Sequence, residues 1–341
     1  MVTEAFKFLL SENRLAAIAV LTFIFLCDNL TPQQPAGLNF YRVYFMDKGD
    51  KEVSDFTPGA LVSARAVERR IRNGIPLIDQ KDIPVADEYL NEISKKGLKL
   101  HCKSKWMNTA LFESDQPITY DSILSLPFVA DVKTVKSAAK STSFPGKLDL
   151  KALHAGINQA GNHLLQTKGH LLHESGFTGK GVLIAVLDAG FTGSESISSL
   201  NGLRQRDGIK ATYDFVEKKV NVYDHHNHGT AVFSILSGTI PGSLQGSAPG
   251  SDFILLRTED DASEFPVEED FWVAGAEFAD SAGADIINSS LGYFQFDDPS
   301  LNYKYSDLDG NSTFISVAAD IAASRGMLVV CSAGNERSGS W

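Results

Sequence analysis

Residues 182–190 read V-L-I-A-V-L-D-A-G, an unbroken apolar run that ends in Asp188 and two small residues. Such a run is typical of a strand that is buried on both faces of a parallel sheet. Open α/β sheets place their functional groups at the carboxyl ends of these strands. We therefore predict a buried parallel strand that carries a carboxylate to the edge of a sheet.

The second half of the chain, residues 151–341, alternates between strand and helix patterns. Because strands that alternate with helices form parallel sheets, this alternation predicts an α/β fold with a doubly wound sheet and helices on both faces. The predicted strands are 182–188, 252–257, 284–288 and 327–331, and the predicted helices lie near 229–238, 268–283 and 313–325.

Residues 40–136 have a different pattern and are predicted to form a separate small α+β domain. The expected order is strand 40–46, helices 60–73 and 85–96, and strands 98–104, 106–113 and 128–135. Residues 137–150 begin S-A-A-K-S-T-S-F-P-G, a small and polar stretch that is typical of a linker.

Two further segments carry candidate chemistry. Residues 224–238, D-H-H-N-H-G-T-A-V-F-S-I-L-S-G, place His228 before a Gly-Thr pair and an apolar helical run, so His228 is expected at the start of a helix. Residues 327–335, M-L-V-V-C-S-A-G-N, form an apolar run that ends in the amide side chain of Asn335. The order acid, base, amide donor matches that of the subtilisin arrangement, in which the serine comes last.

From about Tyr41 onward, the chain resembles the subtilisin-like serine proteases, the subtilases, of the secreted bacterial type. G-S-A-P-G at 246–250 is similar to a small-residue turn of that family, and I-I-N-S-S-L-G at 286–292 is similar to its substrate-binding strand. S-K-W-M-N-T-A at 104–110 resembles a prodomain that acts as chaperone and inhibitor. The G-T-S-M-A-like segment that carries the nucleophile in the family is absent, so we expect the peptidase domain to be incomplete and its Ser to be missing.

The resemblance implies a serine endopeptidase that hydrolyses peptide bonds by acyl transfer. Its expected partners are peptide or protein substrates and its own prodomain. The implied catalytic residues are Asp188, His228 and Asn335, and the implied substrate-binding residues are Ser290, Leu291, Gly292, Ala333 and Gly334.

Two alternatives remain open. One is a catalytically silent fragment or pseudoprotease that only binds peptide. The other is a metal-dependent hydrolase that uses His225, His226 and His228, although contiguous histidines point in divergent directions. We predict no metal site and no cofactor; calcium binding is common in the family, but no residue identifies a site. The acidic run 259–270 is expected to be a solvated loop and helix start.

Composition and the N-terminus bear on partners and location. The net charge is -11, and residues 151–341 hold 24 acidic and 12 basic side chains, which argues against a nucleic-acid partner. Residues 1–36 resemble a signal peptide, because Lys7 and Arg14 precede an apolar run, 15–27, that is shorter than the ~20 residues of a membrane span. We therefore expect a secreted, extracellular or cell-envelope protein with no stable membrane span.

Overall fold

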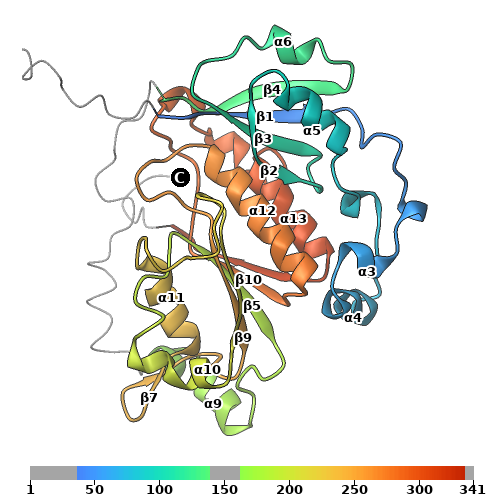
Figure 1. Cartoon of the computed structure of the whole chain (residues 1–341). Coiled ribbons are helices and arrows are strands. Elements are labelled where there is room, and N and C mark those ends of the chain that lie inside the picture. Colours follow the sequence, from blue (N-terminus) through green and yellow to red (C-terminus); the bar gives the residue numbers. More distant parts are fainter. Residues whose placement is uncertain (1–36, 139–161, 335–341) are drawn as a thin grey trace, which may run out of the picture. The chain divides into compact units, whose positions relative to one another are not determined.

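The computed structural model of the chain describes residues 37–138 and 162–334 (Figure 1). The predicted signal peptide and most of the predicted linker lie outside the described residues. None of the helices within 37–138 and 162–334 is long and apolar enough to cross a bilayer.

The first sheet is antiparallel and has the order β2-β3-β1-β4. Its strands are β1 (Asn39–Phe45), β2 (Lys99–Ser104), β3 (Thr109–Ser114) and β4 (Val129–Lys136). Helices α5 (Asp87–Ser94) and α6 (Asp121–Leu124) cover one face (Figure 1) and close a core that includes Val43, Ile93 and Ile123.

The second sheet is parallel and has the order β11-β10-β5-β9-β6. Its strands are β5 (Leu183–Asp188), β6 (Ile209–Asp214), β9 (Asp252–Arg257), β10 (Ile286–Ser289) and β11 (Leu328–Cys331). The central strand, β5, is buried along its whole length, as its apolar sequence predicts.

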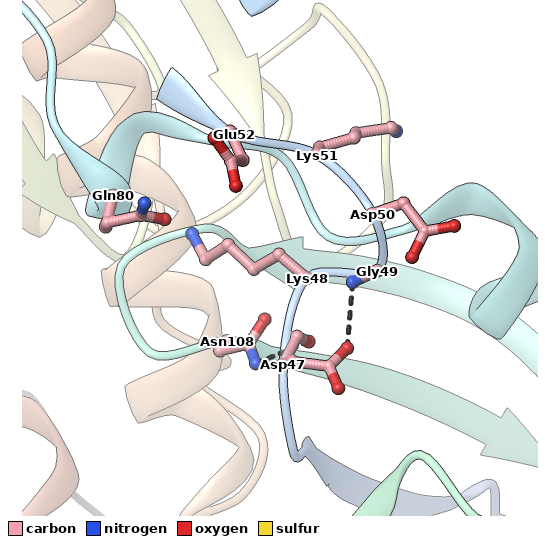
Figure 2. A pocket seen from close by; sticks show the side chains of 8 residues that line it. All are labelled: Asp47, Lys48, Gly49, Asp50, Lys51, Glu52, Gln80 and Asn108. Atoms are coloured by element: carbon pink, nitrogen blue, oxygen red, sulfur yellow. Dashed lines mark hydrogen bonds between the residues drawn. The ribbon is translucent and has the colours of Figure 1, made fainter. Parts of the chain in front are cut away.

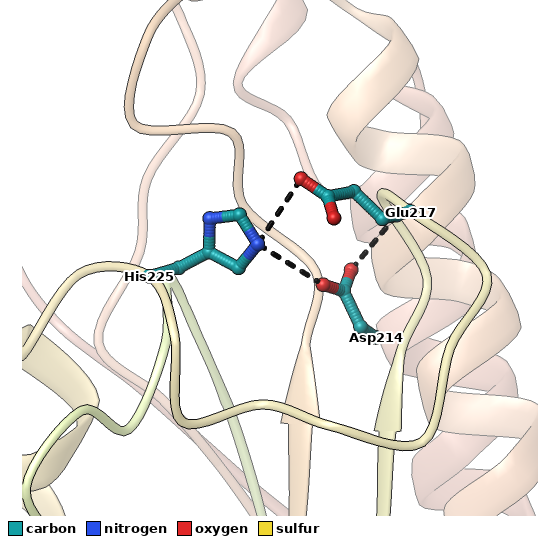
Figure 3. A group of neighbouring side chains, drawn as sticks. All are labelled: Asp214, Glu217 and His225. Carbon is teal, nitrogen blue, oxygen red and sulfur yellow. Dashed lines mark hydrogen bonds and ion pairs between the residues drawn. The ribbon is translucent and has the colours of Figure 1, made fainter.

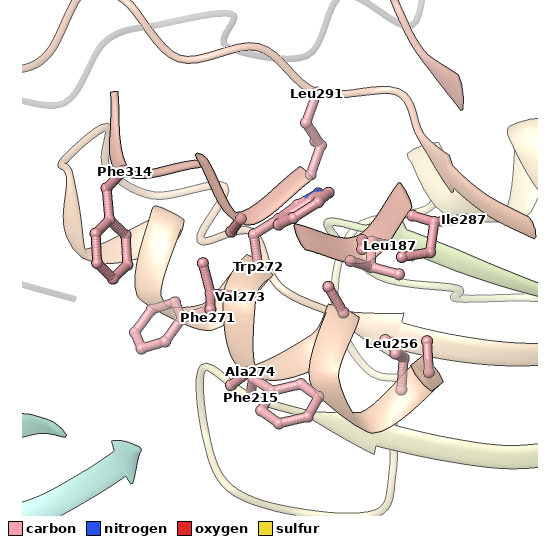
Figure 4. Close-up of a cluster of buried hydrophobic side chains, with 14 of the residues drawn as sticks. Leu187, Phe215, Leu256, Phe271, Trp272, Val273, Ala274, Ile287, Leu291 and Phe314 are labelled. Carbon is pink, nitrogen blue, oxygen red and sulfur yellow. The ribbon is translucent and has the colours of Figure 1, made fainter. Parts of the chain in front are cut away.

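Helices cover both faces of the parallel sheet. Alternate residues of β5 point to opposite faces, so Val186 packs in one core with Phe233 of α11 (His228–Ser237). Leu187 belongs to the other core, with Trp272 of α12 (Val267–Ala282) and Phe314 of α13 (Phe314–Ser324) (Figure 4). The prediction of a doubly wound α/β domain preceded by a small α+β domain is thereby confirmed.

Shorter elements connect these layers. They are α3 (Pro58–Leu61), α4 (Ala64–Arg72), α8 (Asn162–Gln166), α9 (Gly169–Glu174), α10 (Asn201–Gln205), β7 (Thr239–Ile240), β8 (Leu244–Gln245) and the 3-10 turns η1 (Val53–Asp55), η2 (Gln80–Asp82), η4 (Ser198–Leu200), η5 (Pro299–Leu301) and η6 (Tyr305–Asp307). The single helix predicted at 60–73 is two helices, because Val62 and Ser63 are extended and Ser63 caps α4 by accepting a hydrogen bond from the backbone N of Ala66.

The acidic run 259–270 contradicts the prediction of a solvated loop. Glu259, Glu268, Glu269 and Asp270 are all buried. The first sheet covers this helix start and brings a cation to it: Arg42 of β1 donates to Asp270 Oδ2 at 2.6 Å. Burial of Glu269 and Asp270 therefore depends on a charge from the other domain, which local sequence does not reveal.

Candidate active site

Asp188 is the last residue of β5 and has no exposed surface. Its Oδ1 accepts a hydrogen bond from the backbone N of Ala189 at 2.8 Å. The neighbouring strand β9 supports the same strand end, since Thr258 N donates to Asp188 O at 3.0 Å and Arg257 Nε donates to Ala189 O at 3.1 Å. The carboxylate is thus held at the carboxyl edge of the parallel sheet.

His228 is the first residue of α11, and its Nδ1 lies 2.8 Å from Asp188 Oδ1. The next residue, Gly229, permits this approach. A Cβ at position 229 would lie 2.5 Å from Gly190 O and 3.0 Å from the Cβ of Asp188. Only glycine fits between the end of β5 and the start of α11, so the Gly after His228 is required by packing.

The electrostatics of the pair favour a protonated Nδ1. Burial alone would lower the pKa of His228, but the hydrogen bond and charge of Asp188, with the charge of Glu259, raise it above its ordinary value. Because the carboxylate accepts the Nδ1 proton, the neutral ring leaves Nε2 as the basic atom. The pair can therefore act as a general base whose tautomer is fixed by Asp188.

Glu259 is a site residue that the sequence prediction missed. Its carboxylate is buried after the end of β9 and accepts a hydrogen bond from Tyr293 Oη at 2.7 Å. The available signal was its position directly beyond a buried parallel strand, which is the same signal that marked Asp188.

The predicted substrate-binding residues follow two adjacent strands at the same edge. Ser290, Leu291 and Gly292 come directly after β10, and Ala333 and Gly334 come after β11. Ser332 ties the two segments together, because its N donates to Ser289 O at 3.0 Å and its Oγ donates to Leu291 O at 3.1 Å. The side chain of Leu291 is buried in the core against α12 (Figure 4). Asn335 lies outside the described residues.

The three histidines predicted for the metal alternative face different partners. His226 Nδ1 accepts a hydrogen bond from the backbone N of His228, whereas His228 itself bonds Asp188. His225 Nε2 lies 3.1 Å from Glu217 Oε1 and 3.7 Å from Asp214 Oδ2 (Figure 3). The three rings therefore do not converge on one centre.

Cations already balance the group of Asp214, Glu217 and His225. Arg257 Nη1 lies 3.0 Å from Asp214 Oδ2. Lys219 Nζ lies 2.6 Å from Glu217 Oε2 and 3.2 Å from His225 Nε2. A metal ion would have to displace the ammonium group of Lys219, so the arrangement favours an ion-pair network.

A polar pocket of about 620 Å³ lies in the first domain, away from these strand ends (Figure 2). Lys48 anchors it, because its Nζ donates to the carbonyls of Ile83 and Lys105 at 2.6 Å each. Burial lowers the pKa of Lys48 to about 8. The contacts hold the turn after β1 to two other segments of the same domain, and no candidate site residue lines the pocket.

Comparisons with known proteins agree with this geometry. The model of the subtilase family matches residues 179–340, and that of the peptidase S8 propeptide domain of Bacteroidota matches residues 40–147. The chain belongs to the subtilase family. We therefore refer to the first domain as the propeptide domain and to the second as the peptidase domain of this subtilase.

Individual relatives are distant. Subtilisin E of Bacillus subtilis strain 168 is 28% identical over 253 residues, which cover 72% of this subtilase and 54% of that protein. Subtilisin of Bacillus pumilus is 32% identical over 180 residues, covering 51% of this subtilase and 54% of that protein. The chain thus spans about half the length of the curated relatives it matches.

The solved structure of fervidolysin from Fervidobacterium pennivorans, described as a keratinolytic enzyme related to subtilisin, has the same fold. It superposes with a TM-score of 0.51 and 17% identity, covering 89% of this subtilase and 40% of that chain.

Proposed function

We propose that this subtilase is a serine-type endopeptidase that hydrolyses peptide bonds by acyl transfer. The observation that carries the proposal is the 2.8 Å contact between His228 Nδ1 and Asp188 Oδ1 at the carboxyl edge of the parallel sheet. The family match and the preceding propeptide domain support the same activity.

In the proposed reaction, Asp188 holds the imidazole of His228 in one tautomer and stabilises the imidazolium that forms. Nε2 of His228 takes the proton of the serine hydroxyl, whose oxygen attacks the scissile carbonyl, and then gives that proton to the leaving amine. Asn335 is proposed to donate a hydrogen bond to the oxyanion of the tetrahedral intermediate. Ser290, Leu291, Gly292, Ala333 and Gly334 are proposed to bind the peptide beside it.

The propeptide domain is proposed to act as an inhibitor and folding aid of the peptidase domain. Its β2–β3 turn caps a buried carboxylate of α12: Ser104 Oγ donates to Glu277 at 2.5 Å, and the backbone N of Trp106 donates to it at 3.0 Å. Burial raises the pKa of Glu277, so these donors matter for keeping it charged.

We further propose the domain limits and the route of the protein. Residues 1–36 serve as a signal peptide, 40–136 as the propeptide, 137–150 as the linker and 151–341 as part of the peptidase domain. The mature enzyme acts outside the cell or in the cell envelope.

A fluorophosphonate probe tests the proposal, since it labels only an activated serine. The 341-residue chain should remain unlabelled, whereas a longer protein with a G-T-S-M-A-like segment should be labelled at one serine, and His228→Ala should remove the labelling. Labelling of the 341-residue chain at a defined serine would refute the expected missing nucleophile. If the longer protein neither reacts nor cleaves peptides, the alternative of a pseudoprotease that only binds peptide takes its place.

A further inference from the structure

Helix α4 carries two arginines that are buried although they belong to a short surface helix. Arg69 and Arg70 are at most 1% exposed, whereas the side chain of Arg72 on the same helix is 64% exposed. Charged side chains are almost never fully buried unless they are paired. The groups that bind Arg69 and Arg70 therefore indicate the role of α4.

Arg69 binds the carboxyl ends of two peptidase-domain helices at once. Its Nε donates to the carbonyl of Arg325, the C-cap of α13, at 3.0 Å. Its terminal nitrogens donate to the carbonyl of Ala284 and to the carboxylate of Asp280, both near the end of α12. The last carbonyls of a helix lack partners within the helix, and a cation is favoured there by the helix dipole.

The carboxylate of Asp280 is fully buried between two guanidinium groups. Arg69 binds its Oδ1, and Arg70 Nη2 donates to its Oδ2 at 2.7 Å. A reciprocal pair runs in the other direction, because Arg325 of the peptidase domain binds Asp79 of the propeptide domain through two hydrogen bonds of 2.8 and 2.9 Å. Each domain therefore contributes both arginines and carboxylates to ion pairs across the interface between the propeptide and peptidase domains.

The backbone of both helix ends is shaped to receive α4. Gly283 and Gly326 follow the ends of α12 and α13 with φ of +88° and +82°. A Cβ at 283 would lie 2.7 Å from the backbone N of Ala66, and one at 326 would lie 2.8 Å from Asn73 Nδ2. A side chain at 283 would thus push the backbone of α4 away, and one at 326 would displace the side chain of Asn73, the C-cap of α4.

The contact of α4 with the ends of α12 and α13 lies at the amino ends of the parallel strands, opposite to the carboxyl ends where Asp188 lies. Ala284 and Arg325 lie two and three residues before β10 and β11, so they mark the amino ends of the parallel strands, whereas Asp188 ends β5. Strands of about six residues separate the two edges by roughly 20 Å. A helix bound at the amino ends of the strands therefore need not contact the catalytic residues at their carboxyl ends.

We propose that the carboxyl ends of α12 and α13 form an arginine-binding exosite of the peptidase domain. Its ligand is a helix that presents two adjacent arginines, here α4, and it anchors the propeptide domain independently of the catalytic edge. The inference goes beyond the proposed function, because it needs neither a nucleophile nor turnover.

Amide hydrogen exchange on the full chain tests the local effect. Arg69→Met should accelerate exchange in segments 279–286 and 323–328 by about tenfold or more, because a buried Asp280 loses one partner and two helix ends lose a donor. Exchange in β5 should stay within about twofold of the wild type. Arg72→Met is the matched control: Arg72 also bonds Asp285 at 2.8 Å, but its side chain is 64% exposed, so exchange at both helix ends should change far less than in Arg69→Met. Equal protection in Arg69→Met and wild type, or acceleration spread evenly over β5 and both helix ends, overturns the exosite.

Retention after cleavage tests the anchoring. A site-specific protease sequence is inserted between residues 139 and 161, the full chain is cut there, and the two parts are followed by gel filtration on dilution. In the wild type and Arg72→Met, the propeptide domain should remain with the peptidase domain. Arg69→Lys, which keeps the charge but loses the forked geometry, should release it at concentrations at least about tenfold higher. If Arg69→Met does not fold, this conservative variant and Asp280→Asn still decide: unchanged retention in both overturns the proposal.

Discussion

His228 Nδ1 and Asp188 Oδ1 lie 2.8 Å apart, although one residue starts a helix and the other ends a strand 40 positions earlier. The contact exists because β5 and α11 meet at Gly229, where a methyl group would not fit. Packing of backbone against backbone thus places an acid and a base within hydrogen-bond distance.

The pKa of His228 should lie above its ordinary value of 6.5 in the folded chain, and Asp188→Asn should lower it below that value. Without the Asp188 carboxylate, burial, which is the largest effect, disfavours the imidazolium, and only the charge of Glu259 opposes it. Because the folded-state pKa is raised, the stabilisation by this pair is complete below pH 6.5 and is lost as the pH rises through the folded-state pKa. Titration of the ring of His228 by NMR, in the wild type and in Asp188→Asn, measures the shift. An unchanged pKa in Asp188→Asn would contradict the coupling.

In a longer protein that contains the nucleophile, His228→Ala should remove nearly all turnover. Asn335→Leu should lower kcat by about 10² to 10³ with little change in KM, a magnitude taken from the oxyanion asparagine of subtilisin itself. The difference follows from the proposed roles, since an oxyanion donor acts mainly in the transition state. Steady-state kinetics on a peptide substrate provides the measurement.

The neighbouring histidines are the control for this prediction. His225→Ala and His226→Ala should each retain substantial turnover, because neither ring bonds Asp188. If each abolished turnover as His228→Ala does, and added zinc or manganese restored it, the enzyme would be a metal-dependent hydrolase.

Glu269→Gln and Asp270→Asn should have opposite effects on stability at pH 8. Burial raises the pKa of Glu269 to about 7, although Arg42 opposes the shift. The folded state then holds a proton that the unfolded state has lost, so stability falls as the pH rises from about 4.5 to about 7. Glu269→Gln removes this loss and should stabilise the chain by roughly 3 kcal/mol at most.

Asp270→Asn instead leaves the guanidinium of Arg42 without its closest carboxylate and should destabilise the chain by about 3–5 kcal/mol. Urea unfolding of both variants at pH 5 and pH 8 separates the effects. Equal destabilisation by the two substitutions at pH 8 would show that the Glu269 carboxylate stabilises the folded chain there, which would contradict its raised pKa.

Gly229→Ala should destabilise the peptidase domain by about 1–3 kcal/mol, because the added methyl would overlap Gly190 O and the ring of Phe191. It should also weaken the Asp188–His228 contact and lower the pKa of His228. Gly202→Ala in α10 is the control, since a Cβ there meets nothing within 4 Å. That variant should gain about 0.5–1 kcal/mol. Thermal unfolding distinguishes the two, and similar melting temperatures for both would contradict the packing argument.

The apolar strands were the predictable part of the fold. The strand predicted at 252–257 is β9 with the same limits, and the strand predicted at 182–188 is β5 from Leu183. In contrast, β6 was missed, because I-K-A-T-Y-D at 209–214 is only partly buried and lacks a continuous apolar pattern. The residue alternation and the hydrophobicity of a sequence predict a strand only where most side chains of that strand are buried.

Charge pairing between distant segments was not predictable. Arg69 and Asp280 are 211 positions apart, and each alone reads as an exposed charge on an amphipathic helix. Similarly, Glu269 and Asp270 fit a solvated helix start until Arg42 and the first sheet cover them. For the candidate site, the sequence predicted two strand ends and a helix start. Glu259 was missed although it follows a predicted strand, because its local sequence does not show that its carboxylate is buried and raises the pKa of His228.

The order of strands has a consequence for synthesis on the ribosome. Every partner of the first sheet lies within residues 39–136, so that sheet can close its hydrogen bonds early. β5 leaves the ribosome next but has no neighbour until β9 and then β10 are made. Domains formed first are present while later segments emerge. Arg42 and Arg69 have already been translated when the carboxylates of α12 leave the ribosome. These carboxylates can therefore pair with the two arginines as soon as the helix forms.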